Sequence, residues 1–248
     1  MSDEPTIARQ PHAVLDLPSR EKKAIKIERL LDLEGRAEPI RLLEIGTGSG
    51  GIAAYFATHP HRKFVVDAVD VVDNRIGDAP FGFALVHDTT LPFADEAFDV
   101  VITNHVIEHV GDANAQRAHL AEVRRVLRAD GIAYLAVPNR WQVVEPHYRL
   151  AFLSWLPHAW RSTYLRLSGR GKVYDCEPLT ERALEALLAE AGVSFENVCV
   201  DALYMTIELE RDTYRSVGML RHVPRTVFEW LRPMIPTLTY VLRRSRDD

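Results

Sequence analysis

A glycine-rich loop with an acidic residue at its mouth is the first feature of this sequence that could do chemistry. Residues 41–51 read RLLEIGTGSGG, so a short apolar run enters a loop that contains Gly46, Gly48 and Gly51. Glycines let the backbone turn sharply and approach a ligand without interference from a Cβ atom. Apolar residues then recur at helical spacing, which would aim the N–H groups of a helix N-terminus at the ligand. The pattern predicts a nucleotide-cofactor site.

Two classes of cofactor fit this loop. Gly46, Gly48 and Gly51 satisfy the G-x-G-x-x-G pattern of dinucleotide sites. Read from Glu44, the same residues resemble the first motif of class I S-adenosylmethionine-dependent methyltransferases, with Thr47 inside the loop. The spacing alone does not separate the two classes, so the residues further along the chain decide.

A second apolar strand, residues 64–69, ends in Asp70. This acid comes about 20 residues after the loop, where a carboxylate can accept hydrogen bonds from both ribose hydroxyls. Asp67 and Asp73 are competing carboxylates, but Asp70 directly follows the last apolar residue of the strand. We therefore expect Asp70 to hold the ribose, with Val71 beside it in the cofactor site.

The segments ALVHDTTLPF, residues 84–93, and FDVVITNHVIEHV, residues 98–110, resemble the type 11 group of class I methyltransferases. The resemblance implies that Asp88 accepts from the adenine amine, with the Thr89 backbone beside the ring. It also implies that Asn104 and His105 close the methionine side. The resemblance runs from Arg41 to Pro138 and resumes weakly at 177–192. S-adenosyl-L-methionine is thus the expected cofactor; an NAD-linked oxidoreductase and a noncatalytic binding module remain the alternatives.

The order of elements predicts an α/β fold. Helices are expected at 20–33, at 120–131 with Gly131 as the stop, and at 180–192; a sixth strand is expected at 195–203 and a last one at 238–242. Seven strands alternating with helices imply a doubly wound, Rossmann-like sheet, and the resemblance adds an antiparallel last strand. We expect one domain over 1–248, with lid insertions at about 139–178 and 204–236.

The sulfonium of such a cofactor already activates its methyl group, so alignment and desolvation can supply most of the catalysis. A hydroxyl acceptor would also benefit from a general base, for which histidine is suited near neutral pH. His147, just after the fifth strand expected at 132–137, is the candidate catalytic residue, although a hydrogen-bonded lid histidine with no proton to move is the commoner case. We expect methylation, at oxygen, of a small-molecule, glycan or lipid-linked acceptor.

Two further sequence patterns contain residue types that bind metals. His105 to His109 fits H-x-x-E-H, in which two histidines share a helix face around zinc. The sequence indicates no third ligand, so no metal is expected there. Cys176 and Cys199 lie far apart without C-x-x-C spacing, which suggests neither a thiolate metal site nor a disulfide framework.

The composition and charge of the chain limit the kinds of partner that it is expected to bind. The chain has 248 residues, 47% of them hydrophobic, and a formal charge of −5, which argues against a nucleic-acid partner. Residues 149–161 combine tryptophans, leucines and flanking arginines. This mixture suits contact with a membrane surface or an amphiphilic acceptor. An ordinary lid that buries its apolar face on the domain is the favoured alternative. With a polar, acidic N-terminus and no long apolar run, we expect a cytoplasmic protein, with peripheral membrane contact left open and the oligomeric state not predicted.

Overall fold

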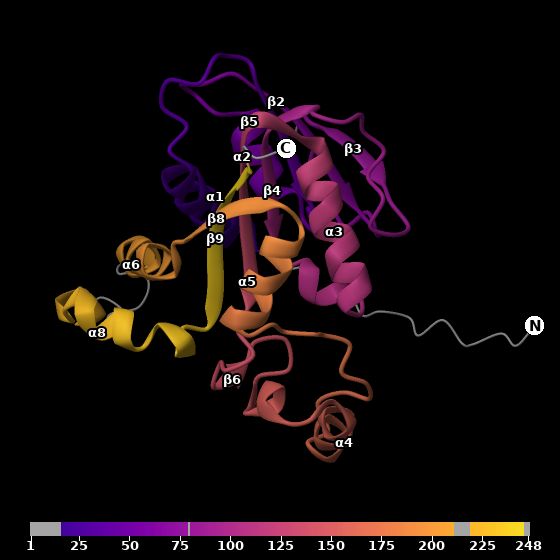
Figure 1. Ribbon diagram of the computed structural model, residues 1–248, viewed down its shortest axis with the longest axis vertical. Coiled ribbons are helices and arrows are strands. Elements are labelled where there is room, and N and C mark those ends of the chain that lie inside the picture. The colour runs from indigo at the N-terminus through magenta and orange to yellow at the C-terminus, as the bar shows by residue number, and fades with distance from the viewer. Residues whose placement is uncertain (1–15, 79, 211–218, 246–248) are drawn as a thin grey trace, which may run out of the picture.

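The computed structural model describes residues 16–78, 80–210 and 219–245, except for the side chain of Arg221. At its centre is a seven-stranded sheet of order β3-β2-β1-β4-β5-β9-β8 (Figure 1). Its strands are β1 (Ile40–Ile45), β2 (Phe64–Asp70), β3 (Gly82–Leu85), β4 (Phe98–Asn104), β5 (Leu127–Pro138), β8 (Val193–Asn197) and β9 (Thr237–Arg244). β3, β2, β1, β4 and β5 pair in parallel, whereas β9 runs antiparallel to β5 and β8. The predicted doubly wound sheet with an antiparallel last strand is confirmed.

Buried strands carry apolar side chains on both faces, and each face has its own cluster. Leu42 and Val100 pack on one side of the sheet, whereas their chain neighbours Leu43 and Val101 pack on the other. Helices α1 (Leu17–Leu31) and α2 (Gly51–Ala57) cover the first face, and α3 (Ala113–Val126) and α5 (Glu181–Glu190) cover the second (Figure 1). This double cover explains why the strands read as continuous apolar runs.

The predicted helix stop at Gly131 is wrong. α3 ends at Val126, and Leu127 is already extended, as the first residue of β5. Leu127 is fully buried and pairs with Phe98, so the apolar spacing that suggested a longer helix is satisfied equally well by a strand. The sequence therefore placed the boundary too late.

The predicted sixth strand at 195–203 is also wrong beyond its first residues. β8 ends at Asn197, and a helix, α6 (Cys199–Glu210), follows at once. The side-chain oxygen of Asn197 accepts a hydrogen bond from the backbone N–H of Cys199, which helps the chain turn into the helix. α6 lies beside α1, where Lys26 donates to the hydroxyl of Thr206.

Residues 139–178, called the insert below, carry the short strands β6 (Val144–Glu145) and β7 (Leu150–Ala151), a 3-10 turn at Leu153–Trp155 and helix α4 (His158–Leu167). The insert lies at the lower end of the molecule, apart from the helices that cover the sheet (Figure 1). It has its own apolar cluster, formed by Tyr148, Leu150, Leu153, Leu165, Tyr174 and Cys176. The insert is therefore a small packed unit.

Residues 204–236, the second expected insertion, fall in three parts. The start belongs to α6, and residues 211–218 lie outside the described residues. The rest carries 3-10 turns at Leu220–His222 and Arg232–Met234 and helix α8 (Arg225–Trp230), whose Phe228 packs on Tyr204 of α6. In the part of the chain that is described, no helix is both long and apolar enough to cross a membrane.

Candidate cofactor and acceptor site

The predicted site residues lie at one edge of the sheet, where the parallel strands have their carboxyl ends. The loop at Gly46 follows β1, Asp70 ends β2, Asp88 follows β3 and His105 follows β4. The insert leaves the same edge at the end of β5. In open α/β sheets, ligands bind outside the carboxyl ends of the strands, so this edge is the expected binding position.

The glycine loop is held in a form that other residues would strain. Gly46, Gly48 and Gly50 all have positive φ angles, of 73°, 54° and 78°. A Cβ atom at Gly46 would collide with the side chain of Val106, in the segment that follows β4. Gly50 caps the N-terminus of α2 in the left-handed conformation. The sequence thus requires glycine here both for conformation and for space.

Glu44 fixes the loop from inside the protein. Its carboxylate is buried and accepts hydrogen bonds from the hydroxyl of Thr47, at 2.6 Å, and from the backbone N–H of Ala53 in α2, at 2.9 Å. Burial raises the pKa of Glu44 to about 8, although both hydrogen bonds act in the opposite direction. Glu44 therefore ties β1, the loop and α2 together.

Asp70 is joined to the same loop. Its Oδ2 accepts from the backbone N–H of Gly48 at 2.8 Å, and its Oδ1 accepts from that of Val71 at 2.7 Å. The competing acids have other contacts: Asp73 is paired with Arg75, and Asp67 lies against Gly82 of β3. Asp70 is thus the acid among the three that the structure brings to the loop.

Asp88 and Thr89, which are predicted to lie beside adenine, are in a turn after β3. Asp88 is exposed and its Oδ1 accepts from the backbone N–H of Thr90 at 2.7 Å, a bond that lowers the pKa of Asp88. Thr89 between them is half-buried. Because β3 pairs with β2 up to Asp70 and Leu85, this turn lies next to Asp70 at the sheet edge.

Beyond β4, Asn104 is buried and its Oδ1 has no hydrogen-bond partner among the described residues. His105 has a φ of 59°, rare for a residue with a side chain, and its backbone N–H donates to Ala136 of β5. Burial and the nearby cation Lys23 hold the pKa of His105 well below its usual range. A strained backbone and an unpaired buried acceptor at one place are typical of a ligand site.

Sequence reasoning missed the contribution of α1 to this site. Arg20 of α1 lies against Gly51, and its Nε is buried without a hydrogen-bond partner among the described residues. Lys23, one turn later, has its pKa lowered to about 7, mainly by burial. No motif marks these residues, because only the packing of α1 on α2 turns them toward the loop. The buried Nε of Arg20, without a partner among the described residues and beside the glycine loop, fits the carboxylate of an amino-acid moiety.

The insert carries a second group of polar side chains, next to the turn that follows β4. His147 Nδ1 lies 2.7 Å from a carboxylate oxygen of Glu145, which is buried. The thiol sulfur of Cys176, also buried, lies 4.0 Å from His147 Nδ1 and 3.7 Å from Nδ1 of His109. We call these four residues the His-Glu-Cys cluster. It joins the 3-10 turn at Ile107–His109, after β4, to both ends of the insert.

Glu108, in the same turn, is fully buried, and neither of its carboxylate oxygens has a hydrogen-bond partner among the described residues. One oxygen lies 3.4 Å from Nδ1 of His105 and 3.9 Å from Nε2 of His109. Burial raises the pKa of Glu108 to about 8. Glu108 thus lies between His105 and His109 of the His-Glu-Cys cluster.

Comparisons with known proteins agree with this geometry. Residues 43–135 match the family model of a methyltransferase domain. A ubiquinone biosynthesis O-methyltransferase of Parvibaculum lavamentivorans is 26% identical over 197 residues, 71% of this chain and 68% of that protein. An uncharacterized methyltransferase of Bacillus subtilis is 33% identical over 105 residues, 40% of each chain.

A solved structure with a similar fold is a phosphoethanolamine N-methyltransferase of Haemonchus contortus in complex with S-adenosyl-L-methionine. Its TM-score is 0.52 at 14% identity, and the match covers 90% of this chain and 52% of that one. At this identity the likeness shows the fold. With the matched family, the seven-stranded sheet and the loop at its carboxyl edge, this chain carries a class I, S-adenosylmethionine-dependent methyltransferase domain.

Proposed function

We propose that the protein transfers a methyl group from S-adenosylmethionine to an oxygen atom of a small-molecule, glycan or lipid-linked acceptor. The observation that carries the acceptor side of this proposal is the Glu145–His147 pair, which the insert brings to the carboxyl edge of the sheet. A histidine oriented by a buried carboxylate suits the removal of a proton from a hydroxyl group.

For the cofactor, we propose that the loop of Gly46, Thr47 and Gly48 turns past the amino-acid end while Glu44 holds the loop in place. Asp70 would accept from the ribose hydroxyls, beside Val71. The hydrogen bond from Gly48 to Asp70 supports this arrangement, because it ties the carboxylate to the loop.

The remaining cofactor contacts are proposed at the two ends of the same edge. Asp88 would accept from the adenine amine, with Thr89 beside the ring. Asn104 and His105 would close the methionine side, where the unpaired Oδ1 of Asn104 can accept from an ammonium group. The unpaired Nε of Arg20 would donate to the carboxylate.

The cofactor supplies an activated methyl group, and the chain supplies alignment, exclusion of water and proton transfer. In this proposal His147 keeps its Nδ1 on Glu145, so its Nε2 is the atom that receives the acceptor proton. The second oxygen of Glu145 accepts from the backbone N–H of Tyr148 at 2.8 Å, which fixes the carboxylate and hence the ring. Removing the proton makes the acceptor oxygen a better nucleophile.

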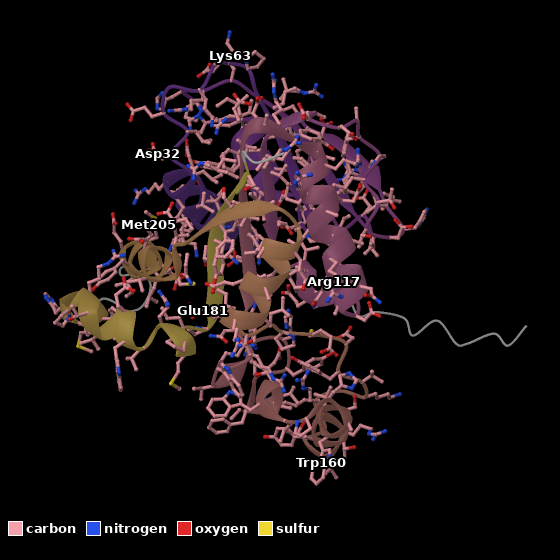
Figure 2. All side chains as sticks on the ribbon, viewed as in Figure 1. Asp32, Lys63, Arg117, Trp160, Glu181 and Met205 are labelled. Carbon is pink, nitrogen blue, oxygen red and sulfur yellow. The ribbon has the colours of Figure 1, made fainter. Side chains whose placement is uncertain are left out.

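The surface of the insert supports an amphiphilic acceptor and contact with a membrane surface. Trp160 is 68% exposed and Leu167 is 83% exposed, and Trp160, in the first turn of α4, lies at the lower tip of the molecule and points away from it (Figure 2). Arg166, Arg170 and Lys172 line an open hollow on the same insert. Exposed aromatic rings beside cations are typical of surfaces that contact anionic lipid. We propose peripheral membrane contact of a cytoplasmic protein through this surface.

Titration calorimetry tests the cofactor assignment directly. The expected result is saturable binding of S-adenosylmethionine and of S-adenosylhomocysteine, with no response to NAD. Saturable NAD binding without a response to either sulfur nucleoside would instead support an oxidoreductase. Methyl transfer from labelled cofactor to fractions of small molecules and glycolipids would then identify the acceptor; cofactor binding without any transfer would favour a noncatalytic binding module.

A further inference from the structure

The His-Glu-Cys cluster brings together three kinds of metal-ligating atoms. A carboxylate oxygen of Glu145, a ring nitrogen of His147 and the sulfur of Cys176 all lie within 4.8 Å of one another. Glu145 is 1% exposed and Cys176 is 2% exposed, so neither is a surface group. The H-x-x-E-H pattern lacked a third ligand in the sequence, but folding places Cys176 of the insert 3.7 Å from Nδ1 of His109.

We propose that Glu145, His147 and Cys176 bind a divalent transition-metal ion of the zinc type. Imidazole, thiolate and carboxylate are the ligands that zinc takes in proteins, and three protein ligands are the number found in its catalytic sites. In a tetrahedral site with bonds of this kind, ligand atoms lie roughly 3.3 to 3.8 Å apart. The sulfur of Cys176 lies 4.0 Å from Nδ1 of His147, close to that range.

Two adjustments remain. The carboxylate oxygen of Glu145 and the sulfur of Cys176, which lie within 4.8 Å of each other, have to approach by up to roughly 1 Å. The Glu145–His147 pair is at hydrogen-bond distance, 2.7 Å, and has to open by roughly half an ångström to admit a metal between its atoms. The backbone N–H of Tyr148 already orients Glu145 through its other oxygen, the kind of outer contact that supports metal ligands. Nδ1 of His109 lies 3.7 Å from the sulfur of Cys176, so a further ring nitrogen borders the three ligand atoms.

Charge also favours a cation at this place. A thiolate and a carboxylate together carry two negative charges, which a divalent ion neutralises inside a buried site. On binding, the S–H bond of Cys176 breaks, a bond from sulfur to the metal forms and the proton leaves to solvent. No electron is transferred, and no further reactant is needed.

This inference goes beyond the proposed methyl transfer and constrains it. Nδ1 of His147 cannot at once donate to Glu145 and coordinate a metal, and a ring bound through Nδ1 carries its proton on Nε2. The metal-bound ring would therefore not accept a proton from the acceptor. Zinc should accordingly inhibit any turnover that depends on His147 as a base.

The test uses the full-length chain without a histidine tag, treated with a chelator and then dialysed. Titration calorimetry with zinc chloride should give about one bound ion per chain. Titration with cobalt(II) should produce a near-ultraviolet absorption band from charge transfer between thiolate and metal. A wild-type protein that binds neither ion, or that binds cobalt without the sulfur band, would overturn the proposal.

Variants locate the site. Cys176→Ser should abolish the cobalt–sulfur band, whereas Cys199→Ser should keep it, because Cys199 is equally buried but bonds to Thr239 elsewhere in the fold. Glu145→Gln should weaken zinc binding at least tenfold, and His158→Ala, an exposed histidine in the same insert, should not. A band that survives in a folded Cys176→Ser protein would contradict the assignment. These readouts need neither cofactor nor acceptor, so a failure of the methyl-transfer proposal leaves them interpretable.

Discussion

The backbone N–H of Gly48 donates a 2.8 Å hydrogen bond to the carboxylate of Asp70, 22 residues further along the chain. This bond connects the loop after β1 with the end of β2. It holds Asp70 in the position from which a carboxylate can also accept from ribose hydroxyls. The loop and the acid are therefore held together as one structural element.

We predict that Asp70→Ala weakens S-adenosylmethionine binding by about 1.5 to 3 kcal/mol, because hydrogen bonds to a charged acceptor are lost. Calorimetric titration of the variant measures this change. Asp73→Ala is the matched control, since Asp73 is paired with the exposed Arg75 and should leave the affinity unchanged. Equal affinities for both variants and the wild type would mean that another group holds the ribose.

Comparing Gly46→Ala with Gly77→Ala separates two costs to stability: the strain of a positive φ angle and the steric collision of a new Cβ atom. Both glycines have positive φ angles, but a Cβ atom at Gly77 would meet nothing within 4 Å, whereas one at Gly46 would collide with Val106. We expect Gly77→Ala to cost about 1 to 2 kcal/mol of unfolding free energy and Gly46→Ala to cost a further 1 to 3 kcal/mol, roughly, from overpacking. Denaturant unfolding of both variants checks this order; equal costs would show that Val106 moves away freely.

Glu44 predicts a pH dependence of stability. Its pKa is raised from 4.5 to about 8 in the folded protein, so between these values the unfolded chain releases the proton and the folded chain retains it. The stability that the neutral acid contributes is complete below about pH 4.5 and is lost as the pH rises through about 8. Glu44→Gln, which stays neutral, should therefore become more stable relative to the wild type as the pH rises from 5 to 8, roughly. Thermal unfolding of both proteins across this range would refute the prediction if the difference stayed constant.

His147→Ala tests the proposed base once an acceptor is known. We expect turnover to fall by about 10² to 10⁴-fold, with cofactor affinity unchanged. Rates are measured from about pH 6 to 9 in the presence of a chelator. His158→Ala provides the control histidine. Unchanged turnover over the whole range would show that His147 moves no proton.

Trp160 and Trp230 allow a paired test of membrane contact. Trp160 lies on α4 of the insert and is 68% exposed, while Trp230 is 81% exposed at the end of α8. Trp160→Ala should lose about 1.5 kcal/mol or more of binding to phosphatidylglycerol vesicles, roughly tenfold in partitioning, and Trp230→Ala should lose none. Sedimentation with vesicles measures this, and phosphatidylcholine vesicles should bind both forms weakly. An equal loss of vesicle binding in the two variants would show that membrane contact is not specific to the insert.

The cofactor half of the molecule could be predicted because its signals are local. A buried strand, a glycine loop and a helix follow one another between Arg41 and Ala57, and Asp70 directly follows the next strand. Boundaries failed where an apolar pattern suits two structures. Leu127 is buried equally well in a helix or a strand, and the apolar run after Cys199 forms α6 instead of extending β8.

The polar groups opposite the loop could not be predicted, because they come from distant parts of the chain. Cys176 meets His109 across 67 residues, and nothing in either segment encodes the path by which the insert returns. Likewise Arg20 reaches the loop only because α1 packs beside α2. Burial of Glu108 without a hydrogen-bond partner among the described residues has no counterpart in the sequence pattern either.

The two ends of the insert lie side by side. Asn139 forms a β-bridge with Leu179, and the backbone N–H of Arg140 donates to the carbonyl of Leu179 at 2.9 Å. The insert has its own apolar cluster, and it joins the sheet domain through two chain segments that pair with each other. A segment attached in this way can be exchanged for another of different length without opening the sheet, since the chain ends that it must join are already adjacent. Replacement of the insert alone would therefore change the residues offered to an acceptor, while the glycine loop and Asp70 would stay unchanged.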